Sequence, residues 1–276
     1  MIDKWYDNFW TSPKNPPESL AFQAFGPAHL IALLICAVIV ALLVVGYCKA
    51  DDTRRHGIRL SVGIIVLLLE LVLRQGAYLV LGIYTPAILP FYACSIVTFC
   101  VFIDAVKPNS WTRQFIYAVG TWGPLCALLF PDWTNQPIFN IYTWQSFLIH
   151  ALMFGYALML LVSKELVPRG SQIWKAAIMV VIAVIIALIF NAIYNTNFWF
   201  LNTGSPGSPL EPIQNLSGNF YIPVLVVLVA ILWTIMYLPW YFAAKSRNAH
   251  GRRGPQQHPA SSTKSTWRQD RSRNAS

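Results

Sequence analysis

Charged residues are scarce in this chain of 276 residues. Asp, Glu, Lys and Arg together make up only 11% of it, against about 25% in an average soluble domain. Hydrophobic residues, with Tyr, Trp and Cys included, make up 56%. This balance excludes an ordinary water-soluble enzyme.

The chain also lacks the cysteine pairs that build disulfide frameworks or zinc sites. Its five cysteines lie in or beside apolar runs and include no Cys-x-x-Cys pair, so we expect free thiols. No cofactor is expected. A metal held by His29, Cys94 and His150 is a less favoured alternative, because a site needs three or four converging ligands. The five cysteines are Cys36, Cys48, Cys94, Cys100 and Cys126.

Long apolar runs, by contrast, are abundant. A bilayer core of about 30 Å requires about 20 apolar residues per helix, and seven runs approach this length with few charges. The sequence therefore predicts an all-α, polytopic membrane protein with a seven-helix domain over residues 28–243. Its spans are residues 28–48, 60–81, 88–106, 114–131, 144–163, 176–196 and 221–243. Gly120, Gly123 and Pro124 interrupt the fourth span, which membrane helices tolerate when neighbouring groups satisfy the freed backbone.

The distribution of Lys and Arg predicts the orientation. Seventeen of the twenty basic residues flank one side of the predicted spans, whereas the other side has only Lys4 and Lys14. Because basic loops stay in the cytoplasm, we expect the N-terminus outside and the C-terminus inside the plasma membrane. Residues 1–27 are then a short external arm. An odd number of spans agrees with this orientation.

Residues 244–276 are basic and have almost no apolar content, so we expect a disordered cytoplasmic tail. From residue 245 onward the tail carries +7 of the formal net charge of +9. Attraction to anionic membrane lipid explains this charge. Nucleic-acid binding is not expected, because Trp267 alone provides no stacking platform.

Ionisable residues inside a predicted span are candidates for function, because unpaired charges are costly at membrane depth. Glu70 and Arg74 are four residues apart in the second span, so they share a helical face and can pair. Two interpretations stay open. The pair is purely structural, or Arg74 uses its planar guanidinium to hold a phosphate or carboxylate.

Three reactive groups on different spans fall at one predicted depth. With a rise of 1.5 Å per residue, Arg74, Cys94 and His150 each lie about 9 Å below the outer boundary. Further polar residues fall near this level, while the inner halves of spans one, five and six are nearly all apolar. We therefore expect a pocket open to the outer leaflet rather than a through-channel. The further polar residues are His29, Tyr92, Gln145, Ser146, Asn191, Asn195 and Asn197.

Cys94 and His150 match the pattern of nucleophilic catalysis, in which a histidine activates a thiol on an adjacent element. The alternative is that Cys94 is a small packing residue and His150 a hydrogen-bonded core residue. Cys36 and Cys100 are expected in the core, and Asp104 at the cytoplasmic interface beside Lys107. A retinal protein is excluded because the seventh span has no lysine, and a serine protease because no span has a Gly-x-Ser nucleophile with a histidine partner.

Four segments occur in order along the chain: Leu89–Ile96 (LPFYACSI), Ala127–Asp132 (ALLFPD), Trp144–His150 (WQSFLIH) and Asn197–Leu201 (NFWFL). Together they resemble the YwaF-like integral membrane protein family, to which transmembrane protein 164 is related. The resemblance covers about residues 20–243 and implies a seven-span protein. For the eukaryotic relative it implies a phospholipid acyltransferase with a catalytic Cys and His, at Cys94 and His150 here. Bacterial relatives usually have a His two residues before the Cys, where this chain has Tyr92, and His29 matches a polar family position.

Our leading hypothesis is a bacterial membrane protein that transfers or hydrolyses lipid acyl groups, with a phospholipid as substrate. Cys94 attacks the acyl carbonyl, His150 is the general base and Arg74 holds a phosphate headgroup. Asn197 or a backbone amide stabilises the oxyanion, and Glu70, His29 and Tyr92 complete the binding residues. The alternatives are a small-molecule carrier that uses Glu70, Arg74 and His150, and a structural partner of another membrane protein.

Overall fold

The structure is a computed structural model that describes residues 8–10 and 18–251. Within these ranges the fold is all α, as predicted: the described residues contain no β-strand, only an isolated bridge between Ala21 and Pro137. Most of the predicted external arm and residues 252–276 of the predicted tail lie outside the described residues.

Five helical segments are long and apolar enough to cross a membrane, by length and composition. The first is α1 (Pro27–Lys49). The second combines α2 (Asp52–Leu68), the π-helix η3 (Leu69–Gly76) and α3 (Ala77–Val80). The third is α7 (Ile141–Val162), and the fourth joins η5 (Gly170–Gln172) to α8 (Ile173–Tyr194). The fifth joins α9 (Leu210–Ser217) and η7 (Gly218–Phe220) to α10 (Tyr221–Gly251), which continues beyond the predicted boundary at residue 243.

The predicted spans at residues 88–106 and 114–131 contain shorter helices. The short η4 (Pro86–Ile88) precedes α4 (Ala93–Val106), and residues 114–131 are divided between α5 (Ser110–Ala118) and α6 (Trp122–Leu129). The break falls at Gly120, where a Cβ atom would lie 2.7 Å from the Ile116 carbonyl oxygen and 3.1 Å from Val97 Cγ1 on α4. Only glycine fits this close approach, so the chain bends where it meets α4.

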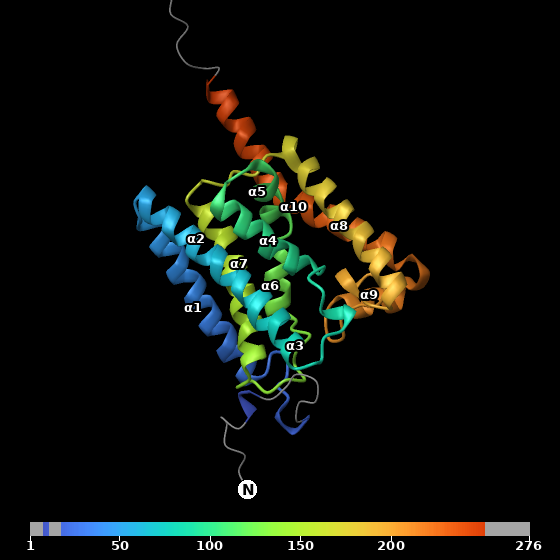
Figure 1. Cartoon of the computed structure of the whole chain (residues 1–276). Helices are drawn as coiled ribbons and strands as arrows, with labels where there is room; N and C mark the ends of the chain where they lie inside the picture. The colour runs from blue at the N-terminus through green and yellow to red at the C-terminus, as the bar shows by residue number, and fades with distance from the viewer. Residues whose placement is uncertain (1–7, 11–17, 252–276) are drawn as a thin grey trace, which may run out of the picture.

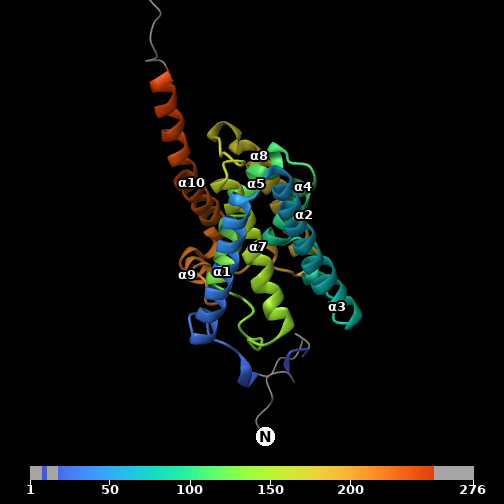
Figure 2. The same ribbon diagram turned by 90° about the vertical axis from the view of Figure 1, so that its left-hand side faces the viewer.

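Helix α7 forms the centre of the bundle. In its most apolar window 61% of the residues are buried, against 22% for α1. Helices α1, α2, α4 and α6 pack around α7, and Figure 2 shows α7 between α1 and the α2–α3 segment. The central helix α7 is also the least apolar of the five segments, with a mean hydropathy of 1.8 against 3.1 for α1. Helices α1, α8 and α10, whose positions Figure 1 shows, expose many large apolar side chains of the kind that face lipid.

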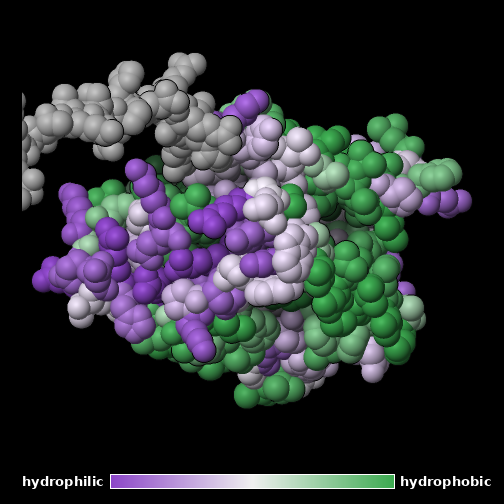
Figure 3. All heavy atoms as spheres, turned by 90° about the horizontal axis from the view of Figure 1, so that it is seen from above, coloured by the Kyte–Doolittle hydropathy of each residue, from purple (hydrophilic) through white to green (hydrophobic). Residues whose placement is uncertain are grey.

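One end of the bundle is closed by a cluster of charged residues around Glu165, in the α7–α8 connection. We call this the basic end and the opposite one the loop end. Arg59 Nη1 lies 2.7 Å from Glu165 Oε2, Arg55 Nη1 lies 3.5 Å from Glu165 Oε1, and Arg113 Nη1 donates to the Glu165 carbonyl oxygen over 2.7 Å. Figure 3, which looks at the molecule from above, shows hydrophilic residues gathered beside large apolar areas.

Asp104 corrects one sequence-based expectation. It belongs to the basic end but is fully buried rather than interfacial. Its Oδ1 lies 3.2 Å from Arg113 Nε, and its Oδ2 accepts from Tyr156 Oη over 3.0 Å. The sequence suggested Lys107 as its neighbour, whereas the turn between α4 and α5 brings Arg113 to it instead.

Candidate functional site

We call the half of the bundle nearer the loop end the loop half. The π-helix η3 shapes the polar region in this half. A π-helix has a wider turn than an α-helix and closes i to i+5 hydrogen bonds, so residues four and five positions ahead both approach the same side chain. Arg74 Nη1 accordingly donates to Glu70 Oε1 over 3.0 Å, and Gln75 Nε2 donates to the same oxygen over 3.2 Å. The predicted pairing of Glu70 with Arg74 is therefore present, and π-helical turns are frequent at functional sites.

Glu70 also ties η3 to the neighbouring helices. Ser95 on α4 donates its hydroxyl to Glu70 Oε1 over 3.0 Å, and Arg74 Nη1 donates to Ser95 Oγ over 3.2 Å. From α7, Gln145 Nε2 donates to the Leu69 carbonyl oxygen over 3.3 Å. The Glu70 side chain is only 3% exposed, and the bonds from Arg74, Gln75 and Ser95 supply the partners that this buried carboxylate requires.

Arg74 keeps part of its donor capacity. All its hydrogen bonds to Glu70 and Ser95 involve Nη1, and the guanidinium carbon lies 5.6 Å from the centre of the Tyr92 ring. Among the described residues, Nε and Nη2 have no hydrogen-bond partner, and the side chain is 25% exposed. The geometry leaves donors for a further anionic group, so the pair has both a structural role and unused capacity.

Cys94 lies in the first turn of α4. Tyr92 occupies the N-cap position, and in the described part of the chain no side chain caps this helix end. The first amides of a helix have no partner within the helix, and its positive dipole end favours an anion there. Cys94 is half-buried, and a Cβ atom on Gly123 of α6 would lie 3.9 Å from its Sγ. The absence of a side chain at Gly123 therefore leaves room beside the thiol.

His150 is held in one tautomer. Its Nδ1 lies 2.7 Å from the Ser146 carbonyl oxygen, which can only accept, so Nδ1 carries the proton and Nε2 has the free lone pair. Nε2 has no hydrogen-bond partner among residues 8–10 and 18–251. The Trp133 ring stacks on the imidazole with the ring centres 5.4 Å apart and the planes inclined by 14°.

Cys94 and His150 lie at the same level of the bundle. Helices α4 and α7 both run toward the basic end, because Asp104 near the end of α4 and Glu165 just after α7 belong to the same charged cluster. One turn beyond Cys94 and His150, Thr98 Oγ1 lies 3.3 Å from Met153 Sδ. Cys94 and His150 are both within electrostatic range of Glu70 and Arg74. No hydrogen bond joins Cys94 directly to His150 within the described ranges.

Asp132 was not among the predicted site residues, although it closes one of the family-like segments. It is accessible at the surface of the α6–α7 connection and within electrostatic range of Cys94, Tyr92 and Arg74. Desolvation by the surrounding protein raises the pKa of its carboxyl, and the Arg74 charge acts in the opposite direction. Its place at the end of the family-like segment Ala127–Asp132 was the signal that could have identified it.

Two predicted binding residues, His29 and Asn197, use their polar atoms in other hydrogen bonds. His29 is fully buried; its Nδ1 accepts from the Phe25 amide over 2.8 Å, and its Nε2 donates to the Leu128 carbonyl oxygen over 2.9 Å. Both ring nitrogens are therefore occupied. Asn197 closes its own loop, since its Oδ1 accepts from the Asn202 and Thr203 amides, and its Nδ2 donates to the Thr203 carbonyl oxygen.

The other cysteines do not extend the site. All five thiols are unpaired, Cys36 and Cys100 are buried as expected, and Cys126 is exposed. Within the described residues no group of three or more His, Cys, Asp and Glu side chains is placed to hold a metal ion.

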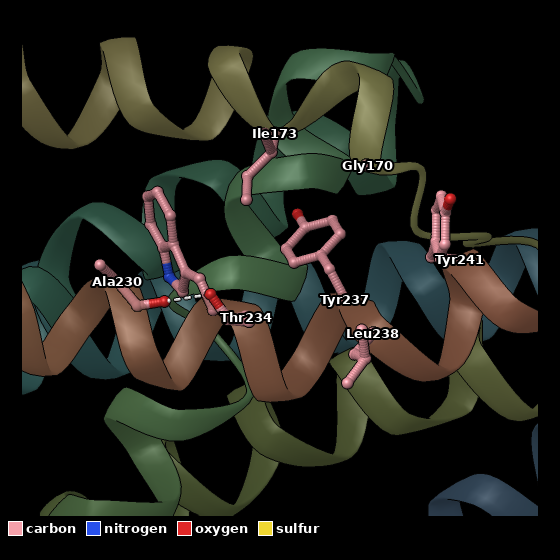
Figure 4. Close-up of a pocket in the computed structure, with 8 residues that line it drawn as sticks. Gly170, Ile173, Ala230, Thr234, Tyr237, Leu238 and Tyr241 are labelled. Carbon is pink, nitrogen blue, oxygen red and sulfur yellow. Dashed lines mark hydrogen bonds between the residues drawn. The ribbon is translucent and has the colours of Figure 1, made fainter.

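A surface groove of about 430 Å³ lies at a different place, between the start of α8 and α10 (Figure 4). Its lining is mainly apolar and aromatic, and Thr234 donates its hydroxyl to the Ala230 carbonyl oxygen over 2.7 Å. No ionisable side chain other than Tyr237 and Tyr241 lines it, so it offers apolar shape rather than acid–base chemistry. Its lining residues are Gly170, Ile173, Ala230, Trp233, Thr234, Tyr237, Leu238 and Tyr241.

The long apolar helices and the charged groups buried between them define an all-helical, multi-pass membrane protein with a polar cluster inside its helix bundle. A family model described as the TMEM164 family matches residues 24–237, and the chain belongs to this family. The predicted resemblance to a family related to transmembrane protein 164 is thereby confirmed. No curated protein and no solved structure matched the chain.

Proposed function

We propose that the chain is a membrane-bound lipid acyltransferase or acyl hydrolase in which Cys94 is the nucleophile and His150 the general base. The observation that carries this proposal is the common level of the two groups, with Cys94 at an uncapped helix start and His150 presenting the unprotonated Nε2. A thiol and a base on adjacent elements are the minimum required for acyl transfer. Catalytic hydrogen bonds commonly tighten only when the substrate binds.

In the proposed first step, the Cys94 proton passes to His150 Nε2 and the sulfur forms a bond with the acyl carbonyl carbon. The ester carbon–oxygen bond breaks, and the leaving oxygen takes the proton from His150. In the second step a lipid hydroxyl or water gives its proton to His150 and attacks the thioester. The carbon–sulfur bond then breaks, and the proton returns to Cys94.

Arg74 is the proposed anchor for a phospholipid phosphate. Its unused Nε and Nη2 donors and the neighbouring Tyr92 ring support this role, because the guanidinium fork suits phosphate geometry. Glu70 fixes the orientation of the fork. In this proposal the chain crosses the plasma membrane of a bacterium seven times, α4 and the α5–α6 pair being two short crossings, and the loop end faces outward.

The direct test uses the full-length protein in detergent micelles with p-nitrophenyl palmitate. Acylation of Cys94 releases one burst of p-nitrophenolate per active molecule, and Cys94→Ala should abolish the burst. Cys126→Ala, which removes the exposed thiol of α6, is the matched control and should keep the burst. An unchanged burst in Cys94→Ala would refute the proposal that Cys94 is the nucleophile of an acyl-transfer enzyme.

A carrier for anionic solutes is the second candidate. It is favoured by the unused donors of Arg74, together with the cluster of charged residues that closes the basic end. Cells that lack the chain separate the two functions when complemented with the wild type or with Cys94→Ala. An altered phospholipid acyl composition that only the wild type restores supports the enzyme. A solute-uptake defect that both versions restore supports the carrier.

A further inference from the structure

Trp133 has two features that the acyl-transfer proposal does not use. It lies in the α6–α7 connection, where its ring stacks on His150 and packs edge-on against Phe147 with ring centres 5.5 Å apart. Its Nε1 is buried and has no hydrogen-bond partner within the part of the chain that the structure describes. Buried indole N–H groups usually find an acceptor, so this donor is an exception that requires an explanation.

The ring that carries this donor stacks on the proposed base. The Trp133 and His150 planes are nearly parallel, and each ring has one nitrogen without a partner among the described residues, Nε1 of Trp133 and Nε2 of His150. One nitrogen can only donate and the other accepts a proton. An ester attacked at its carbonyl carbon needs both functions, because a base must take the thiol proton while a donor meets the developing oxyanion.

We propose that Trp133 donates its Nε1–H to the carbonyl oxygen of the acyl group attacked by Cys94, while its ring holds the His150 imidazole. This inference rests on the proposed acyl transfer. It assigns the oxyanion role to Trp133 together with the uncapped amides of α4. Asn197, the residue expected from the sequence, uses its side chain within its own loop.

Two substitutions separate the donor from the ring. Trp133→Phe keeps an aromatic ring beside His150 and removes the N–H, whereas Trp133→Leu removes both. Trp144→Phe is the matched control, because Trp144 also packs against Phe147, with ring centres 6.0 Å apart, whereas the ring stacked on His150 in the described residues is that of Trp133. Size-exclusion profiles and melting temperatures in detergent establish that each variant is folded.

Two reactions of Cys94 should respond differently in the full-length protein. Acylation by p-nitrophenyl palmitate builds charge on a carbonyl oxygen, whereas alkylation by iodoacetamide does not. Trp133→Phe should slow acylation about 10²-fold, as the loss of one oxyanion donor does, and leave the alkylation rate of the Cys94 peptide and its pH profile unchanged. Trp133→Leu should slow acylation at least as much and also shift the pH profile of alkylation. Trp144→Phe should match the wild type in both reactions.

The outcomes are distinguishable. If folded Trp133→Phe acylates as fast as the wild type, the Trp133 donor is refuted while acyl transfer at Cys94 stands. If Trp133→Phe slows both reactions equally, the tryptophan acts only through packing, and the inference is also wrong. If the wild type shows no Cys94-dependent acylation, the proposed function fails, and this inference with it.

Discussion

The two charged regions of the bundle differ in how completely their groups are paired. At the basic end, the carboxylates of Asp104 and Glu165 pair with Arg55, Arg59 and Arg113, and they also accept hydrogen bonds from Tyr156 and Tyr47. In this cluster Arg59 Nε is the exception that has no partner among the described residues. In the loop half, the Glu70 carboxylate is satisfied, but Arg74, His150 and Trp133 each have a nitrogen without a partner among the described residues.

This difference separates a structural cluster from a candidate site. Buried polar groups are normally hydrogen-bonded because an unpaired one costs stability. The basic end follows that rule almost completely, as expected for a cluster that holds α2, α4, α5 and α7 together. In the loop half the buried exception is Trp133 Nε1. Arg74 and His150 add nitrogens that have no partner among the described residues, so a further molecule can supply the missing partners there.

The largest expected effect on catalysis is at the base. His150→Gln should lower the rate of Cys94 acylation by about 10²–10⁴-fold, the usual contribution of a positioned general base, with little change in melting temperature. The burst of p-nitrophenolate measures the rate. His29→Leu is the contrasting variant: it should lower stability by about 1–3 kcal/mol, because it leaves two buried backbone groups unpaired, while the rate per folded molecule stays unchanged. The opposite pattern would exchange the roles of the two histidines.

The largest expected effect on stability is at the basic end. Asp104→Asn removes a fully buried carboxylate and leaves Arg113 with only the longer carboxylate contact to Glu165, at 3.9 Å, so it should destabilise the protein by about 3–5 kcal/mol. Thermal unfolding in detergent measures this loss. Asp51→Asn, at a side chain that is 62% exposed, keeps an N-cap residue and should have almost no effect. Equal melting temperatures for the two variants would show that the basic end is not a structural cluster.

An intermediate effect is expected at the proposed phosphate anchor. Arg74→Lys keeps the charge but loses the planar fork. It should weaken competition by a diacyl phospholipid against p-nitrophenyl palmitate about tenfold, equivalent to roughly 1.4 kcal/mol. The neutral ester should react as before. Arg54→Lys, whose side chain is 80% exposed at the basic end, is the control. If competition is the same in Arg74→Lys and the wild type, Arg74 belongs with the fully paired groups.

The smallest effect is expected at Ser95. Ser95→Ala removes one hydroxyl that donates to Glu70, while Arg74 and Gln75 continue to bind the carboxylate. The free energy of unfolding should fall by about 0.5–1.5 kcal/mol, and Cys94 acylation should stay within about twofold of the wild type, a change worth under 1 kcal/mol. A much larger loss of activity with normal stability would give Ser95 a direct part in the chemistry.

Much of the fold could be predicted because hydrophobic length is a local property. The apolar runs corresponding to α1, α2–α3, α7, α8 and α10 are visible in the sequence, and Gly120 marked the weak point of the fourth predicted span. The separation of α5 from α6 could not be predicted, because it depends on the close approach of Val97 to Gly120. The end of α10 at Gly251 was missed because the polar composition there resembles that of a tail.

The candidate site was partly visible for a similar reason. The rise per residue put Arg74, Cys94 and His150 at one depth, and the structure brings their helices together. The sequence could not identify Trp133, because the path of the α6–α7 connection determines which residue its ring contacts. Nor could it predict the π-helical turn that adds Gln75 to the Glu70 pair. His150 was predicted as the general base and His29 as a binding residue. The sequence could not show that backbone groups occupy both nitrogens of His29.

The most direct measurement is mass spectrometry of the Cys94 peptide after rapid quenching of the full-length protein with p-nitrophenyl palmitate. The account predicts a palmitoyl thioester on Cys94 that hydroxylamine removes, formed at least about 10²-fold more slowly in His150→Gln, with no acyl group on Cys126. An unmodified Cys94, or equal acylation of Cys94 and Cys126, would contradict it.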